Sequence, residues 1–133
     1  MKMMLGGHVA QEVAPSCVLL VEDEVVIRAL LAEELRDHGL VVVEAVNADE
    51  AWAYLAAGGR ADLLFSDVSM PGSMTGADLA RRVKTAYPGM KAILMSGNPG
   101  SANIVGLGPF IAKPYRLEAA AQLALKTLGL GAP

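Results

Sequence analysis

Cysteine, aromatic residues and long apolar runs are scarce in this chain of 133 residues. The single cysteine, Cys17, excludes an internal disulfide and a metal site built from several thiolates. No apolar run approaches about 18 residues, so we expect no membrane-spanning helix, and residues 1–15 lack the apolar segment of a secretory leader. Because only 5% of the residues are aromatic, a core has to be built from aliphatic side chains and methionine.

Blocks of positive charge are missing as well. The chain has 11 Lys and Arg residues against 14 Asp and Glu residues, a net charge of -3. Arg81, Arg82 and Lys84 lie close together, but they belong to one helical pattern. A chain of this kind has no electrostatic footprint for direct nucleic-acid binding. We therefore expect neither nucleic acid nor membrane among its partners, and a cytoplasmic location.

The length and the 53% hydrophobic content fit one globular domain with a real core. We expect a flexible N-terminal extension over residues 1–15, a domain over residues 16–129 and a tail over residues 130–133. No output domain is expected after residue 129.

Apolar runs and helical patterns alternate along the chain. Strands are predicted at 17–21, 40–46, 62–67 and 91–96 and within 108–114, and helices within 25–39, 47–59, 75–89 and 116–129. Such alternation is typical of an α/β fold with a parallel sheet and helices on both faces. Residues 97–108 carry four glycines and a proline, so the helix expected between the fourth and fifth strands is short or absent.

Two helices have predicted core faces. In the first helix we expect one buried stripe, made of Val26, Leu30, Leu31 and Leu35. In the last helix we expect another, made of Leu117, Ala121, Ala124 and Leu128. Leu123 and Leu125 of the last helix cannot both face that core, so one of them is a candidate for a partner surface.

Charged and hydroxyl groups stand where the predicted strands end. Glu22 and Asp23 follow the first strand, Asp67 ends the third, Ser96 ends the fourth and Lys113 follows the fifth. Ligands of parallel sheets bind at the carboxyl ends of the strands. Clustered carboxylates without His or Cys ligands suit Mg²⁺, and Lys113 adds a point donor for phosphate.

A carboxylate in such a cluster can act as a nucleophile toward phosphorus, and Asp67 is the best candidate because it lies mid-sheet. Each residue also has a simpler explanation. Asp23 and Glu24 could be helix N-terminal acids, Asp67 a turn residue and Lys113 an exposed lysine. Their joint occurrence at the strand ends disfavours these separate explanations.

Four segments carry a resemblance to a known family. VLLVEDE, LLFSDVSMPG, ILMSG and FIAKPY resemble, in order, the signature segments of the response-regulator receiver domain of two-component signalling. The resemblance spans residues 16–129, and the wording is closest to stand-alone receivers and to receivers of hybrid histidine kinases. It implies a doubly wound, flavodoxin-like five-stranded sheet with strand order 2-1-3-4-5.

The resemblance also implies a function. Asp67 would accept a phosphoryl group from a histidine kinase or a histidine phosphotransfer protein, and the domain would catalyse only its own phosphorylation and dephosphorylation. The implied Mg²⁺ ligands are Glu22, Asp23, Asp67 and the backbone carbonyl of Ser69. Lys113 would contact the phosphoryl group, and Ser96 and Phe110 would be the switch residues. A cis peptide bond before Pro114 and a monomer or weak dimer are expected as well.

Three other functions are weighed against this one. A Mg²⁺-dependent phosphohydrolase would usually carry an acid two residues after its aspartyl nucleophile, where this chain has Ser69. A flavin-binding domain of the same topology needs a glycine- and hydroxyl-rich phosphate loop after the first strand, where this chain has Glu22, Asp23 and Glu24. The third alternative is a scaffold of the same fold that is never phosphorylated, which the intact set of acids disfavours.

Overall fold

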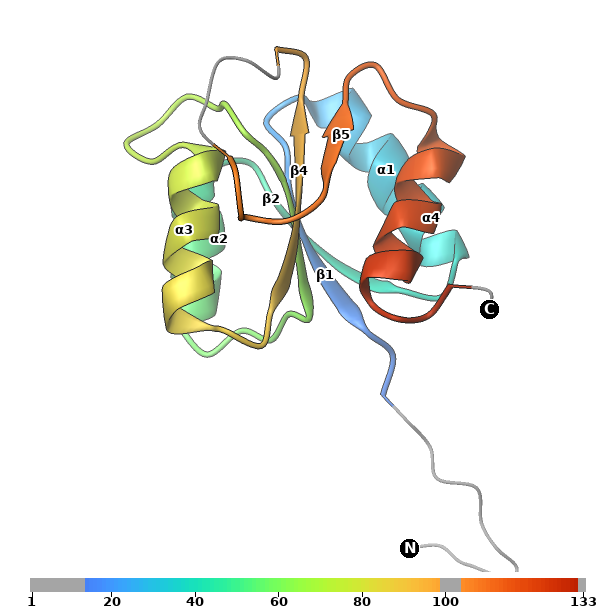
Figure 1. Cartoon of the computed structure of the whole chain (residues 1–133), viewed down its shortest axis with the longest axis horizontal. Helices are drawn as coiled ribbons and strands as arrows, with labels where there is room; N and C mark the ends of the chain where they lie inside the picture. The colour runs from blue at the N-terminus through green and yellow to red at the C-terminus, as the bar shows by residue number, and fades with distance from the viewer. Residues whose placement is uncertain (1–13, 99–103, 132–133) are drawn as a thin grey trace, which may run out of the picture.

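The computed structural model describes residues 14–98 and 104–131, so most of the predicted N-terminal extension, residues 1–13, lies outside the described residues. Within the described residues, five strands and four helices follow one another along the chain (Figure 1). They are β1 (Cys17–Val21), α1 (Val25–Asp37), β2 (Val41–Ala45), α2 (Ala48–Ala56), β3 (Leu63–Asp67), α3 (Gly76–Ala86), β4 (Lys91–Ser96), β5 (Phe110–Ala112) and α4 (Leu117–Thr127).

The strands form one sheet in the order β2-β1-β3-β4-β5, and each neighbouring pair is parallel. Figure 1 shows α2 and α3 on one face of this sheet and α1 and α4 on the other. The predicted doubly wound α/β fold and its strand order are therefore confirmed. All carboxyl ends of the strands point to one edge, where the functional site is expected.

The central strands are buried on both faces, which explains their continuous apolar sequences. In β1, Leu19 and Val21 join the core cluster on the side of α2 and α3. Val18 and Leu20 alternate with them and join the cluster on the side of α1 and α4. Side chains of a strand point to opposite faces in turn, so one run of aliphatic residues fills both cores.

The predicted buried stripe of α1 is wrong in half of its residues. Val26 is 69% exposed and Leu30 is 47% exposed. The buried residues of the helix are Leu31, Ala32 and Leu35. The side of the helix that faces the core is therefore the one that carries Ala32, not the one that carries Val26 and Leu30.

Arg28 explains this difference. It lies one turn before Leu31 and Ala32, on the core-facing side, and its side chain is only 14% exposed. Its guanidinium donates a hydrogen bond to the backbone carbonyl of Glu22 (2.8 Å) and pairs with the Glu44 carboxylate (3.2 Å). A largely buried guanidinium whose hydrogen bonds are satisfied thus lies on the side of the helix that carries Leu31, Ala32 and Leu35.

In α4, the prediction that Leu123 and Leu125 cannot both face the core is wrong. Both are partly buried and pack against the same core cluster. The residues nearest the sheet are small, because Ala120, Ala121 and Ala124 are the buried ones. Small residues let the helix approach closely, so leucines on both of its flanks reach the core.

No helix connects β4 to β5 within the described residues 97–98 and 104–109, which agrees with the predicted short or absent fourth helix. Ile104 and Leu107 pack against the core cluster that includes α3. The ammonium of Lys84, on α3, donates to the Gly106 carbonyl (2.8 Å). Among the described residues, none of the helices is both long and apolar enough to cross a membrane.

Candidate functional site

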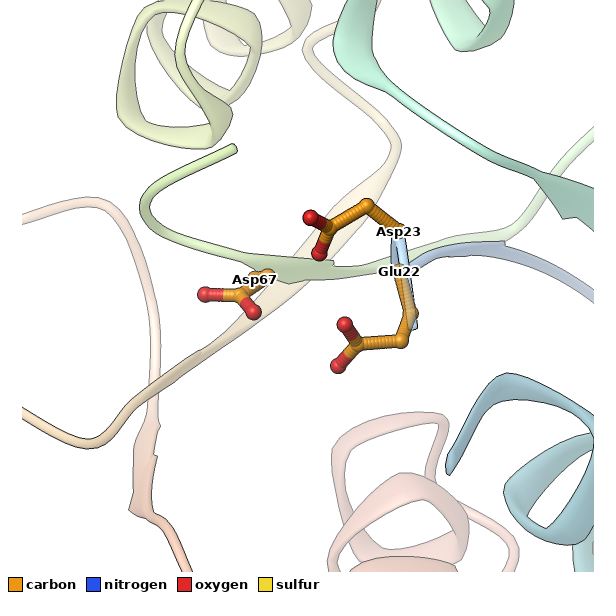
Figure 2. A group of neighbouring side chains, drawn as sticks. All are labelled: Glu22, Asp23 and Asp67. Carbon is orange, nitrogen blue, oxygen red and sulfur yellow. The ribbon is translucent and has the colours of Figure 1, made fainter. Parts of the chain in front are cut away.

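Three carboxylates meet at the carboxyl end of the sheet. Glu22 and Asp23 directly follow β1, and Asp67 is the last residue of β3, the neighbour of β1 in the sheet. One ligand oxygen from each lies within 4.8 Å of the others, and Figure 2 shows the side chains of Glu22 and Asp23 on the side of their strand where Asp67 lies. Glu22 is fully buried and Asp67 is 7% exposed, whereas Asp23 is open to solvent.

Lys113 joins the two buried acids. Its ammonium donates to Asp67 Oδ2 (2.6 Å) and to Glu22 Oε1 (2.8 Å). Lys113 follows β5, which lies two strands away from β3, so its side chain reaches back over the end of β4. The peptide bond between Lys113 and Pro114 is cis, as predicted. The predicted convergence of acids and lysine from separate parts of the chain is thus what the structure has.

Burial and pairing shift the pKa values of this ion pair. Burial raises the pKa of Glu22, although hydrogen bonds from Lys113 and from the backbone of Glu24 oppose the shift. Burial also disfavours the charged form of Lys113, but the hydrogen bonds to Asp67 and Glu22 outweigh it and raise the Lys113 pKa above its usual range. Lys113 therefore stays an ammonium ion at every physiological pH.

The other predicted site residues lie around this cluster at different depths. Ser69 is exposed, and its backbone N–H donates to Asp67 Oδ1 (3.3 Å). Ser96, at the end of β4, is 5% exposed; its hydroxyl accepts a hydrogen bond from the Asn98 N–H (2.9 Å), and its carbonyl accepts one from the Lys113 N–H (2.9 Å). Phe110 is partly buried against the core cluster on the α3 side and is not part of the acidic group.

The start of α3 lies directly against the backbone of Asp67. A Cβ on Gly76, the first residue of α3, would overlap the carbonyl oxygen of Asp67. Thr75 caps the helix and forms a reciprocal capping box with Asp78. Glycine is therefore required at this position by close approach, and the approach fixes where the end of β3 lies.

Two residues near the acids were not predicted from the sequence to lie there. Arg28 holds the carbonyl of Glu22, as described above. The hydroxyl of Tyr115 is buried and makes no hydrogen bond with the described residues. Burial and the nearby Glu22 raise the pKa of Tyr115 to about 12. Neither residue has a sequence signal of its own: the helical spacing of α1 favoured a stripe through Leu30 rather than a core side that includes Arg28, and nothing in the sequence marks Tyr115.

The donor atoms of the cluster fit a hard divalent cation. All three side chains offer carboxylate oxygens, the ligands that Mg²⁺ prefers, and the exposed Asp23 leaves room for the waters that Mg²⁺ retains. One ammonium faces three carboxylates, so the cluster keeps a net negative charge that a cation would offset. Asp67 is also a carboxylate with a nearby ammonium, an arrangement that suits nucleophilic attack on phosphorus.

Comparison with known proteins decides the family. A model of the response regulator receiver domain matches residues 18–124. The chain belongs to this family. It is 36% identical over 107 residues to the sensor kinase CckA of Brucella abortus (strain 2308), and 33% identical over 111 residues to the response regulator GtcR of Aneurinibacillus migulanus.

These matches cover 76% and 80% of this chain, but only 11% of the kinase and 45% of the regulator. The chain thus spans less than half the length of either relative. Among solved structures, the receiver domain of NtrX from Brucella abortus has 30% sequence identity and a TM-score of 0.75, over 84% of this chain and 98% of that one. The receiver domain of the hybrid histidine kinase CckA has 30% identity and a TM-score of 0.72, over 85% and 99%. The resemblance to hybrid-kinase receivers is thereby confirmed.

Proposed function

We propose that this receiver domain takes a phosphoryl group from a histidine kinase or a histidine phosphotransfer protein onto Asp67, in a Mg²⁺-dependent reaction. One observation carries the proposal: Lys113 donates short hydrogen bonds to Asp67 (2.6 Å) and to the buried Glu22 (2.8 Å), beside the exposed carboxylate of Asp23. A nucleophilic carboxylate, a phosphate-binding ammonium and a set of cation ligands then share one rim of the sheet.

In this proposal the three acids share the metal ion, and Asp67 also accepts the phosphoryl group. The protein ligands of Mg²⁺ are Glu22, Asp23, Asp67 and the backbone carbonyl of Ser69. Mg²⁺, when bound, supplies the positive charge that offsets the carboxylates and binds a phosphoryl oxygen. The backbone N–H of Ser69 already contacts Asp67 Oδ1, which supports a role for this loop in the same site.

The bonds that form and break in the transfer step belong to Asp67 and the donor. A carboxylate oxygen of Asp67 attacks the phosphorus of a phosphohistidine, the new O–P bond forms, and the N–P bond breaks with its electron pair left on the imidazole nitrogen. The Lys113 ammonium stabilises the charge on the phosphoryl oxygens. Water later attacks the same phosphorus, and the O–P bond breaks with its electron pair left on the Asp67 carboxylate, which frees phosphate; the domain thus acts only on its own phosphoryl group.

Phosphorylation would redistribute the bonds of Lys113 and Ser96. Lys113 exchanges a carboxylate oxygen for a phosphoryl oxygen, and the Ser96 hydroxyl, which accepts one hydrogen bond, can still donate one. Phe110, which packs against the same core cluster as Ile104 and Leu107, then changes its packing and shifts a pre-existing equilibrium. The signal passes on through protein contacts, in the cytoplasm, from a monomer or a weak dimer.

A protein donor is supported by the surface next to the acids. Val25 and Val26, at the start of α1, are 66% and 69% exposed. Leu30 lines a groove with Pro114 and Tyr115 at the end of the sheet that carries the site. Exposed apolar groups are typical of protein interaction sites. Here the two valines closely follow Glu22 and Asp23 in the chain, and Lys113, which contacts Glu22 and Asp67, also lines the groove.

Mass spectrometry after incubation with acetyl phosphate and Mg²⁺ tests the proposal. We expect a mass increase of about 80 Da, one phosphoryl group, on the unsubstituted chain. The increase should be absent from Asp67→Asn and from samples with excess EDTA. A folded, Mg²⁺-binding chain that never gains this mass would end the proposal. Many turnovers of p-nitrophenyl phosphate per chain would instead indicate a phosphohydrolase.

A further inference from the structure

Ser69 lies in the loop between β3 and α3, residues 68–75. This loop is held by a residue outside the acidic site, Asp49. Asp49, in the first turn of α2, accepts a hydrogen bond from the Ser73 hydroxyl (2.7 Å) with one carboxylate oxygen. Its other carboxylate oxygen accepts a hydrogen bond from the Ser73 backbone N–H (3.3 Å). The two residues are 24 positions apart, so the contact joins the loop to a different helix.

The loop backbone is shaped to meet this carboxylate. Gly72, immediately before Ser73, has a φ of 129°, a conformation that side-chain-bearing residues rarely adopt. A Cβ at this position would lie 2.9 Å from Asp49 Oδ2. Glycine thus permits both the backbone conformation and the close approach that the two hydrogen bonds require.

The rest of the loop is anchored in the core. Met70 and Met74 are each 7% exposed, and the Val68 N–H donates to the Met95 carbonyl of β4 (2.8 Å). Residues 71–73 between the two methionines are exposed. Asp49 therefore holds residues 71–73, a segment that a single residue, the buried Met70, separates from Ser69.

We propose that Asp49 is a positioning residue for the metal site: its grip on Ser73 fixes the loop, and the loop fixes the Ser69 carbonyl relative to Asp67. This inference rests on the proposed function. The Ser69 N–H contacts Asp67 Oδ1 (3.3 Å), so a displacement of the loop reaches the acceptor carboxylate directly. Mg²⁺ demands near-ideal octahedral geometry, so a loosened loop weakens Mg²⁺ binding more than it weakens the fold.

Calorimetric titration with Mg²⁺ tests whether the contact between Asp49 and Ser73 affects Mg²⁺ affinity. Outer partners of metal ligands typically change metal affinity by about 10- to 100-fold, and we expect Asp49→Ala to raise the Mg²⁺ dissociation constant by about tenfold. Ser73→Ala, which removes one of the two hydrogen bonds, should raise it less. The double variant should bind no more weakly than Asp49→Ala alone, because both substitutions remove the same contact.

Two further variants distinguish the loss of the hydrogen bonds to Ser73 from the loss of a negative charge. Glu50→Ala removes the same charge from the same turn of α2, and Glu50 accepts its hydrogen bond from the Val46 N–H rather than from the loop. It should bind Mg²⁺ like the unsubstituted chain. Asp49→Asn loses the charge but keeps an oxygen that accepts from the Ser73 hydroxyl, so it should retain most of the affinity. Equal losses in Asp49→Ala, Asp49→Asn and Glu50→Ala would assign the effect to charge and overturn the proposal.

The remaining outcomes also support or overturn the proposal. A lowered melting temperature of Asp49→Ala with an unchanged Mg²⁺ dissociation constant would make the contact purely structural and overturn the proposal. If Asp49→Ala fails to fold, Ser73→Ala carries the test, because it removes a single exposed hydroxyl. Mg²⁺ binding without phosphorylation of the unsubstituted chain would defeat the proposed function alone. No Mg²⁺ binding by that chain would defeat both.

Discussion

Replacement of Lys113 by methionine tests the electrostatic basis of the site. Methionine has a similar length and keeps an apolar stem, but it removes the ammonium that donates to Asp67 (2.6 Å) and Glu22 (2.8 Å). Glu22 is fully buried and Asp67 is 7% exposed. Without Lys113, and without Mg²⁺, these two carboxylates face each other with no cation to offset their charge.

The expected loss of stability follows from the burial of the pair. Removal of one member of a buried ion pair destabilises a protein by about 3–5 kcal/mol, because the other charge stays buried and uncompensated. The Lys113 side chain is 17% exposed, so water offsets part of this penalty and we expect about 3 kcal/mol. That is a large share of the about 5–15 kcal/mol that stabilises a typical domain.

Mg²⁺ should reverse much of this loss. A divalent ion bound by the carboxylates supplies the positive charge that the ammonium supplied before, so the free energy of unfolding should rise more on addition of Mg²⁺ in Lys113→Met than in the unsubstituted chain. Phosphorylation should nevertheless stay slow in the variant, because the ammonium that stabilises the phosphoryl oxygens is gone.

Urea unfolding, followed by the fluorescence of Trp52, the only tryptophan, measures both effects in EDTA and in excess Mg²⁺. Lys91→Met is the control, because Lys91 is an exposed lysine at the start of β4 and its loss changes the net charge equally. If Lys113→Met were as stable as Lys91→Met in EDTA, the buried acids would not depend on the ammonium, and the reasoning would fail.

Three other substitutions test separate parts of the structure. Leu35→Ala should lower the free energy of unfolding by about 2–5 kcal/mol, whereas Leu30→Ala, at a residue that is 47% exposed, should lower it by less than about 1 kcal/mol. Urea unfolding of the two variants tests whether Leu35 rather than Leu30 faces the core. Gly76→Ala should cost about 1–3 kcal/mol and slow phosphorylation by acetyl phosphate, because its Cβ displaces the backbone of Asp67. Burial raises the Tyr115 pKa from 10.0 to about 12, so the folded state holds this proton more tightly than the unfolded state does, and the associated stability is present below about pH 10 and is lost as pH rises toward about 12. The loss of stability between about pH 10 and about pH 12 should therefore be larger in the unsubstituted chain than in Tyr115→Phe, which keeps only the loss from Lys113, whose pKa is also raised.

The fold was predictable because each strand and helix has a local signature. β1 reads CVLLV and is buried on both faces, which is what a central parallel strand requires. Asn47 and Thr75 cap α2 and α3 through their own side chains, each accepting from a backbone N–H three residues later. Strand order is a different matter: no local signal specifies it, and it was predicted from the family resemblance alone.

The proximity of the acids was predictable from topology rather than from any side chain. In a parallel sheet every carboxyl end lies on one edge, so residues that end β1 and β3 have to meet once those strands are neighbours. The 2.6 Å bond from Lys113 to Asp67 needed one more condition, a fifth strand placed beside β4. The sequence pattern placed this short strand, which has three residues, within residues 108–114, whereas its place beside β4 was predicted from the family resemblance.

The supporting contacts were not predictable, because their reasons lie in tertiary geometry. The helical spacing of α1 favoured a stripe through Leu30, and nothing in that spacing shows that Arg28 lies on the core side with its guanidinium on the carbonyl of Glu22. Asp49 likewise reads as an ordinary first-turn acid that stabilises its own helix. Its second task, to hold Ser73, exists only because the loop after β3 passes the start of α2. The residues that carry the chemistry can thus be predicted from their positions at the strand ends, whereas the residues that hold them in place can be identified only in the folded structure.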